Sequence, residues 1–118
     1  MNKNWIFKNS PFEMLAIAAK RLFPDIEYEA YFDYQIRPEE NGQKVYGFTD
    51  FGENGTIAIF VDSELTIHNA VEIFAHEIAH AAVGVEHDHD DVWEKAFKDL
   101  FDEYNKIGDE MFGGQKEE

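Results

Sequence analysis

The residues best suited to chemistry are two histidines four positions apart, His76 and His80, with Glu77 between them. Residues four apart on a helix lie on the same face, so both imidazoles would point toward one place. Two imidazoles aimed at one point are suitable ligands for a single metal ion. Glu77 would project about 100° further round the helix. There its carboxylate can accept a proton from a water molecule instead of occupying a ligand position.

This spacing matches the HExxH motif, in which one helix supplies two zinc ligands and a glutamate acts as general base. Zinc in such a site lowers the pKa of a water molecule and polarises a carbonyl group. The motif therefore predicts a zinc-dependent metallopeptidase. Zn2+ is the expected cofactor, His76 and His80 are two of its ligands, and Glu77 is the catalytic residue.

The helix that carries the motif is apolar on more than one side. One stripe at helical spacing contains Ile67, Ala70, Val71, Phe74, Ile78, Ala81 and Val85. The two histidines lie on the opposite side, and further alanines flank them. We therefore expect protein to cover both sides, so that the imidazoles need polar or metal partners.

A catalytic zinc takes three protein ligands and keeps one open position. The loop after the helix is the natural source of the third ligand, because it must turn back across the histidine face. His87 and His89 are the leading candidates in that loop. The earlier His68 is expected to be a surface or capping residue. Weaker candidates for the third ligand are Glu86, Asp88, Asp90 and Glu94.

Turn and capping signals divide the chain into six elements, which predicts an α+β domain with a small, mainly antiparallel sheet. The first strand is expected to pair with the second as a hairpin, and Asn54-Gly55 is expected to turn the second into the third. Gly84 and Gly108 are expected to end the last two helices. The expected helices are 10–24, 67–84 and 91–108, and the expected strands are 26–36, 44–50 and 56–61.

Composition limits the function further. The chain of 118 residues is long enough for a single domain, predicted to span 1–118 with an ordered core at about 10–107 and a polar C-terminal tail. It contains no cysteine, so a metal must be held by His, Asp or Glu. A net charge of −15 argues against direct nucleic-acid binding. No segment is apolar enough to cross a membrane, and the expected location is cytoplasmic.

The segment from the motif to the next helix resembles the SprT-like (Spartan-type) zinc metallopeptidases and the minimal gluzincin-like domains. The resemblance is carried by His76-Glu77-Ile78-Ala79-His80, a short turn with Gly84, and His89-Asp90-Asp91-Val92-Trp93 at the start of an amphipathic helix. It implies a zincin-like fold: an N-terminal helix, a three-stranded sheet, the HExxH helix and a C-terminal helix. Cysteine-rich zinc ribbons and basic DNA-binding surfaces, which are common in that family, are absent from this sequence.

Carried over by position, the resemblance implies that His89 is the third zinc ligand and Trp93 the aromatic residue of a His-x-x-x-aromatic pattern. His87 remains the alternative ligand, and a gluzincin-like site would use Glu86 or Glu94. The strand 56–61 matches the family's strand at the rim of the cleft. Such a strand could pair with the backbone of a peptide or protein substrate.

Two other classes of function fit the same sequence. One is a non-catalytic, zinc-stabilised module that binds peptides, and the other is an acidic interaction domain without metal. A peptidase also needs a group that stabilises the oxyanion, for which Tyr46, His87 and Tyr104 are candidates without rank.

Overall fold

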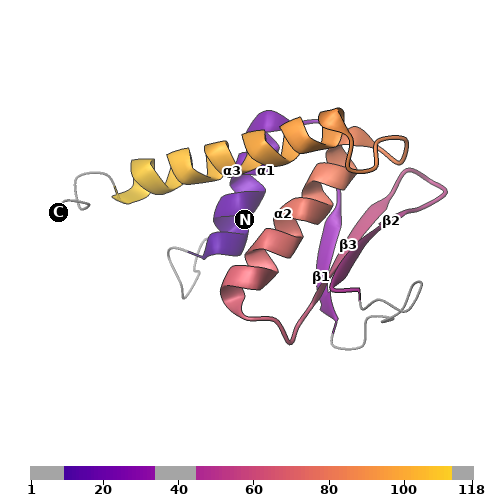
Figure 1. The fold of residues 1–118 in the computed structure, drawn as a ribbon, viewed down its shortest axis with the longest axis horizontal. Coiled ribbons are helices and arrows are strands. Elements are labelled where there is room, and N and C mark those ends of the chain that lie inside the picture. Colours follow the sequence, from indigo (N-terminus) through magenta and orange to yellow (C-terminus); the bar gives the residue numbers. More distant parts are fainter. Residues whose placement is uncertain (1–9, 34–44, 113–118) are drawn as a thin grey trace.

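The computed structural model describes residues 10–33 and 45–112, which form three helices and one three-stranded sheet (Figure 1). This confirms the α+β class. In chain order the elements are α1 (Pro11–Leu22), β1 (Glu29–Asp33), β2 (Gly47–Phe51), β3 (Ile57–Asp62), α2 (Ile67–Val83) and α3 (Asp91–Phe112). Residues 34–36 of the first expected strand, residue 44 of the second and residues 113–118 of the polar tail lie outside the described residues.

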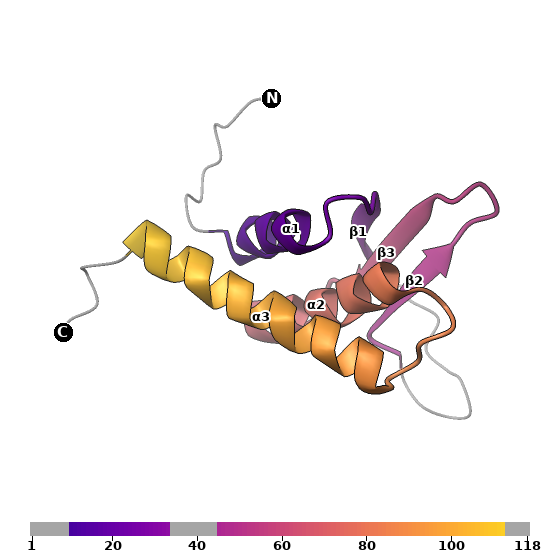
Figure 2. The same ribbon diagram turned by 90° about the horizontal axis from the view of Figure 1, so that it is seen from above.

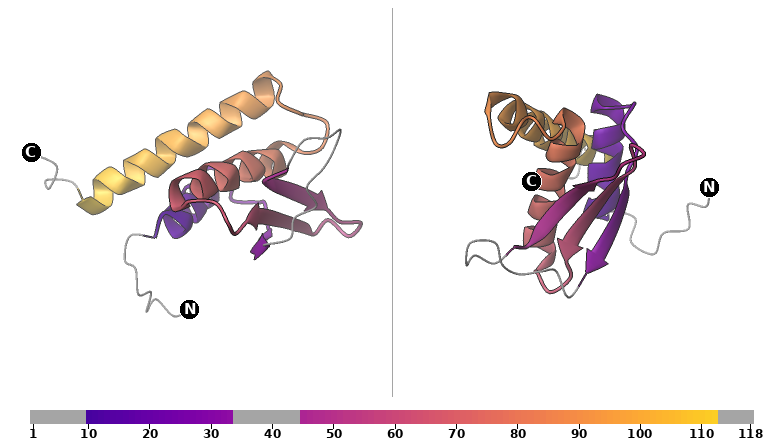
Figure 3. Two further views of the ribbon diagram at one scale, coloured as in Figure 1. Left: turned by 60° about the horizontal axis from the view of Figure 1, so that its bottom comes forward. Right: turned by 90° about the vertical axis from the view of Figure 1, so that its right-hand side faces the viewer.

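The helices gather on one face of the sheet (Figures 2 and 3). Helix α2 packs against β2 and β3, while α3 packs across both α1 and α2. A continuous core joins these layers, and its fully buried centre contains Leu15, Ile59, Ile78 and Leu100. The opposite face of the sheet carries no described helix (Figure 3).

The sheet is mixed, with strand order β1-β3-β2. Strand β3 runs parallel to β1 and antiparallel to β2. The predicted hairpin between the first two strands is therefore wrong, and the sheet is antiparallel in only one of its two pairings. The physical reason lies in β3. Its continuous apolar run suits the centre of a sheet, where Ile59 and Val61 are buried against the helices.

The connection between β2 and β3 follows the prediction. Gly52 donates its backbone N–H to the Thr56 carbonyl at 2.7 Å, and Gly55 turns the chain with φ of +82°. A positive φ is accessible to glycine at little steric cost. The Asn-Gly signal therefore located a real hairpin turn.

Helices α1 and α2 begin where their capping residues predict. The Ser10 hydroxyl accepts the Glu13 backbone N–H at 3.4 Å, and the Thr66 hydroxyl accepts that of Asn69 at 3.3 Å. Gly84 ends α2 with φ of 91° and donates its N–H to the His80 carbonyl. The predicted apolar stripe of α2 is buried only in its middle, since its terminal members Ile67 and Val85 are exposed.

Helix α3 begins at Asp91, as expected, but ends later than predicted. Asp90 is its N-cap, because the Asp90 carboxylate accepts the Trp93 backbone N–H at 3.0 Å. The helix continues through Gly108 to Phe112. Packing against α1 explains the extension: Ile107 is buried there, and Arg21 of α1 forms ion pairs with Glu103 and Glu110. Tertiary contacts thus outweigh the poor helix propensity of glycine.

Within the described part of the chain, none of the helices combines the length and apolarity that crossing a membrane requires.

Candidate metal centre

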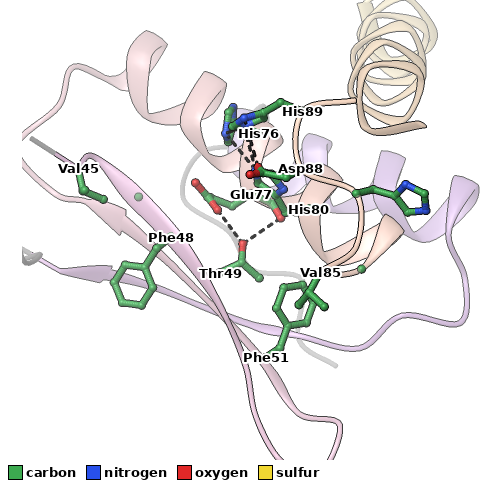
Figure 4. Close-up of a pocket in the computed structure, with 13 residues that line it drawn as sticks. Val45, Phe48, Thr49, Phe51, His76, Glu77, His80, Val85, Asp88 and His89 are labelled. Atoms are coloured by element: carbon green, nitrogen blue, oxygen red, sulfur yellow. Dashed lines mark hydrogen bonds and ion pairs between the residues drawn. The ribbon is translucent and has the colours of Figure 1, made fainter. Parts of the chain in front are cut away.

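Three imidazoles meet above the C-terminal half of α2 (Figure 4). The Nε2 atoms of His76 and His80 are 3.2 Å apart, and the Nε2 atom of His89 lies 3.0 Å from His76 and 3.2 Å from His80. Among the described residues, these three form a group whose ligand atoms lie close enough to bind one metal ion. Three nitrogen donors that converge on one point are a suitable set for zinc and related transition metals.

The loop after α2 delivers the third imidazole. Gly84 lets the chain turn sharply, and His87 donates its backbone N–H to the Gly84 carbonyl at 3.3 Å. His89 has φ of 60°, a left-handed conformation that is uncommon for residues other than glycine. This unusual backbone orientation accompanies the placement of the imidazole of His89 over α2. The Asp88 carboxylate lies 3.3 Å from His89 Nδ1, where it can orient the ring.

His87, the alternative third ligand, is not part of the group. Its Nδ1 lies 2.8 Å from the carboxylate of Asp90, the residue that also caps α3. The acidic candidates for the third position do not join the group either; they are Glu86, Asp88, Asp90 and Glu94. The geometry therefore favours His89, as the position of Trp93 in the sequence suggested.

The Trp93 ring contacts all three imidazole rings. Its ring centroid lies 4.8 Å from that of His76, 5.4 Å from that of His80 and 4.7 Å from that of His89. Its indole N–H donates to the His76 carbonyl at 3.4 Å, and its ring stacks on Phe97. Because the buried indole contacts all three imidazoles, it restricts their orientations, as groups next to the ligands do in metal sites.

Burial favours the neutral form of the His76 and His80 imidazoles. It lowers the pKa of His76 to about 4, and the neighbouring His80 and His89 lower it further. Burial also lowers the pKa of His80, with a smaller contribution from His89. Neutral imidazole is the form that binds a metal ion, so the site is ready to bind at neutral pH without losing protons from these two residues.

Glu77 is the buried acid of the site, with 6% of its surface exposed. Thr49 of β2 donates its hydroxyl to Glu77 Oε1 at 2.7 Å, and the same hydroxyl oxygen lies 3.2 Å from the Glu77 carbonyl oxygen. Burial raises the pKa of Glu77 to about 7, and the Thr49 hydrogen bond opposes that rise. In Figure 4 Glu77 lies between the imidazoles and the Thr49 hydroxyl. A carboxyl with a pKa near 7 can both accept and donate a proton at neutral pH.

Strand β2 approaches α2 closely because Gly47 has no side chain. A Cβ atom at Gly47 would lie 2.5 Å from Ile73 Cγ2 and 3.4 Å from Glu77 Oε2. Sequence reasoning missed both Gly47 and Thr49. Their alternating positions, together with Phe51, mark one face of a strand, but only the observed register shows that this face is turned toward α2.

A pocket of about 780 Å3 opens beside the imidazoles. Its β2 side includes Gly47, Thr49 and Phe51, and Val85 lies on its other side. Strand β3, to which the family resemblance assigned the rim of the cleft, is the central strand and is paired along both edges. That assignment is wrong, and β2 is the strand that lines the pocket.

Of the proposed oxyanion-stabilising residues, only His87 lines this pocket. Tyr46 is half exposed and does not line it. Tyr104 packs against Phe101 beside a separate cavity, which His68 also lines. The structure thus separates Tyr104 and His68 from the three imidazoles.

Comparisons with known proteins place the chain in no family, since no protein-family model, curated protein or solved structure matches it.

Proposed function

We propose that this chain is a zinc-dependent metallopeptidase of the SprT-like kind, which hydrolyses peptide bonds in peptide or protein substrates. The observation that carries the proposal is the convergence of three Nε2 atoms within 3.2 Å of one another, beside a buried glutamate. His76, His80 and His89 would hold the metal. When bound, zinc would supply an acidified water and a polarised substrate carbonyl.

Glu77 is the proton-transfer residue in this proposal. Thr49 occupies its Oε1 atom, which leaves Oε2 to accept a proton from the attacking water. The raised pKa of the buried carboxyl then allows the same proton to pass to the leaving amine. Thr49 acts as a positioning residue, because its hydrogen bond fixes the carboxylate without contact with the reacting atoms.

Strand β2 would hold the substrate. It pairs with β3 along one edge, and no other described strand pairs with its second edge. An extended peptide could add to that edge by backbone hydrogen bonds and lie along the pocket. Phe51 and Val85 would then contact its side chains.

The test begins with the zinc content of protein purified without a histidine tag, measured by elemental mass spectrometry. Wild type is expected to bind one zinc per chain, and His89→Ala is expected to lose it. His87→Ala is the matched control, since it removes an imidazole two residues away in the same loop and should keep the metal. A chain that takes up no zinc, even after zinc is added, would contradict the proposal.

Cleavage of a broad peptide library then tests catalysis. Wild type with zinc is expected to cleave, whereas Glu77→Gln is expected to keep the zinc and lose at least about a hundredfold in rate, as removal of a general base does. Cleavage by Glu77→Gln at the wild-type rate would remove the role given to Glu77. Bound zinc without cleavage by either protein would instead favour the non-catalytic binding module.

A further inference from the structure

The sheet face turned away from the helices carries a row of three aromatic rings, one from each strand. Tyr31 of β1 and Phe48 of β2 are both paired with Phe60 of the central strand β3. The Tyr31 and Phe60 rings stack with centroids 5.4 Å apart, and the Phe60 and Phe48 rings stack at 4.7 Å. We call this row the aromatic row.

The aromatic row lies open to solvent rather than in the core. Tyr31 is 47% exposed and Phe48 is 39% exposed. The strand residues that build the core, Ile59 and Val61, alternate with Phe60 and point to the helix side. No described helix covers the row (Figure 3), and Figure 4 shows the Phe48 ring directed away from Glu77. Contiguous exposed rings of this kind mark interaction surfaces.

Acidic residues flank the aromatic row on both sides. The register places the exposed Glu29 and Asp50 on one side, across Ala58, and Asp33 on the other. Asp62, paired with Asp33, is buried, and its carboxylate accepts the Glu64 backbone N–H. The Tyr31 hydroxyl donates to the Glu29 carboxylate at 2.5 Å, which fixes the ring beside an acid. None of the strand residues on this face is Lys or Arg.

We propose that this open sheet face binds an arginine-bearing basic segment of a partner protein. A guanidinium is planar, so it stacks on aromatic rings while its N–H groups reach neighbouring carboxylates. The aromatic row supplies the ring faces, and Glu29 and Asp50 supply carboxylates beside them. The chain's net charge of −15 also attracts a basic partner over a longer range. The proposal does not depend on the peptidase activity.

The same charges argue against a nucleic acid on this face. Exposed aromatic rings can stack on the bases of single strands, but such sites combine the rings with a positively charged groove. Here carboxylates border the rings and would repel phosphates. A basic, arginine-bearing peptide can both stack on the rings and bind the carboxylates.

The experiment titrates fluorescein-labelled hexa-arginine with the wild-type chain at low salt and follows fluorescence anisotropy. Hexa-arginine is expected to bind more tightly than hexa-lysine. Tyr31→Leu is expected to weaken hexa-arginine binding by about two- to fivefold, the effect of losing one exposed cation–π contact. Phe32→Leu is the matched control, because Phe32 is the next residue of β1 and lies on the opposite face of the sheet. It should leave the affinity unchanged.

Two further variants separate the local acids from the overall charge. Asp50→Asn and Asp102→Asn change the net charge equally, but Asp102 lies on α3. Asp50→Asn is expected to weaken binding more than Asp102→Asn. Tyr31→Phe keeps the ring and should retain binding, so a loss in Tyr31→Leu alone is attributable to the ring.

Several results would overturn the proposal. One is no binding of hexa-arginine by the wild type. Another is equal weakening by Asp50→Asn and Asp102→Asn together with no effect of Tyr31→Leu, since binding would then be a property of the net charge. Tight binding of a single-stranded oligothymidylate, lost in Tyr31→Leu, would assign the face to nucleic acid instead.

Discussion

Helix α2 contributes to two regions that are built differently. On its inner side, Ile78 and Ala75 are fully buried in an apolar core. On its other side, His76, His80 and Glu77 are held by hydrogen bonds, ring contacts and a strand without a side chain at Gly47. The first region stabilises the fold by burial. The second places polar groups where burial is unfavourable for their charged forms. Mutations on the core side of α2 should therefore mainly lower the free energy of unfolding, whereas mutations on the other side should mainly affect zinc binding and pH dependence.

The largest effect on stability is expected on the core side. Ile78→Ala should lower the free energy of unfolding by about 2 to 5 kcal/mol, because it leaves a cavity at a fully buried position. The loss should be the same with and without zinc. His80→Ala, two residues away on the other side of the helix, should lose the zinc and change the stability of the metal-free protein far less. Urea denaturation of the two metal-free variants measures both free energies of unfolding. Equal losses of stability in Ile78→Ala and His80→Ala would contradict the distinction between the two sides of the helix.

The next effect concerns the buried carboxyl of Glu77. Its pKa rises from an ordinary 4.5 to about 7 on folding, so the folded state holds this proton more tightly than the unfolded chain does. The resulting stability is fully present below pH 4.5 and is lost as the pH rises through 7. At pH 8 the metal-free Glu77→Gln variant should be more stable than wild type, by on the order of 3 kcal/mol.

The control is the difference in stability between Glu77→Gln and wild type, measured over a series of pH values. His76 has a lowered pKa and contributes the opposite slope, but it is present in both proteins and cancels in their difference. At pH 4 Glu77→Gln and wild type should have similar stability, because the wild-type carboxyl is then protonated in both states. A stability difference that does not vary with pH would show that Glu77 titrates normally.

Zinc should stabilise only chains that keep the three imidazoles. At free zinc about a hundred times the dissociation constant, a metal that binds only the folded state adds about 2.7 kcal/mol to the free energy of unfolding. Addition of a chelator should remove this increment from wild type and from His87→Ala. His89→Ala should show no increment with or without chelator. Stabilisation of His89→Ala by zinc equal to that of wild type would mean that another residue completes the site.

The metal-binding residues on α2 could be predicted from the sequence because their positions depend only on nearby residues. A spacing of four residues on one helix fixes the directions of His76 and His80, and Thr66 and Gly84 bound that helix by their own backbone chemistry. His89 was one of two leading candidates for the third ligand, because a loop's path depends on contacts such as that between His87 and Asp90.

The contribution of β2 to the site could not be predicted, because it depends on how distant parts of the chain pair in the sheet. Thr49 meets Glu77 only if β2 lies next to α2, and that depends on β3 taking the centre of the sheet. The apolar run 57–61 is typical of a buried strand, but it does not indicate that β3 separates β1 from β2. The error in strand order also misplaced the strand at the rim of the pocket.

The smallest expected changes in stability are those of two glycine variants. Gly108 lies beside the apolar core, and Gly47 lies beside the metal centre. Gly108 lies inside α3, where a Cβ atom would meet only Met14 Cε at 3.6 Å, an ordinary contact. Gly108→Ala should therefore stabilise the fold by about 0.5 to 1 kcal/mol, the difference in helix propensity. Gly47→Ala should instead destabilise it, because the new Cβ atom would lie 2.5 Å from Ile73 Cγ2 and 3.0 Å from the Phe60 backbone oxygen. Thermal unfolding of both variants compares an added methyl group in the two regions. If Gly47→Ala also stabilised the fold, the close approach of β2 to α2 could not be what positions Thr49 against Glu77.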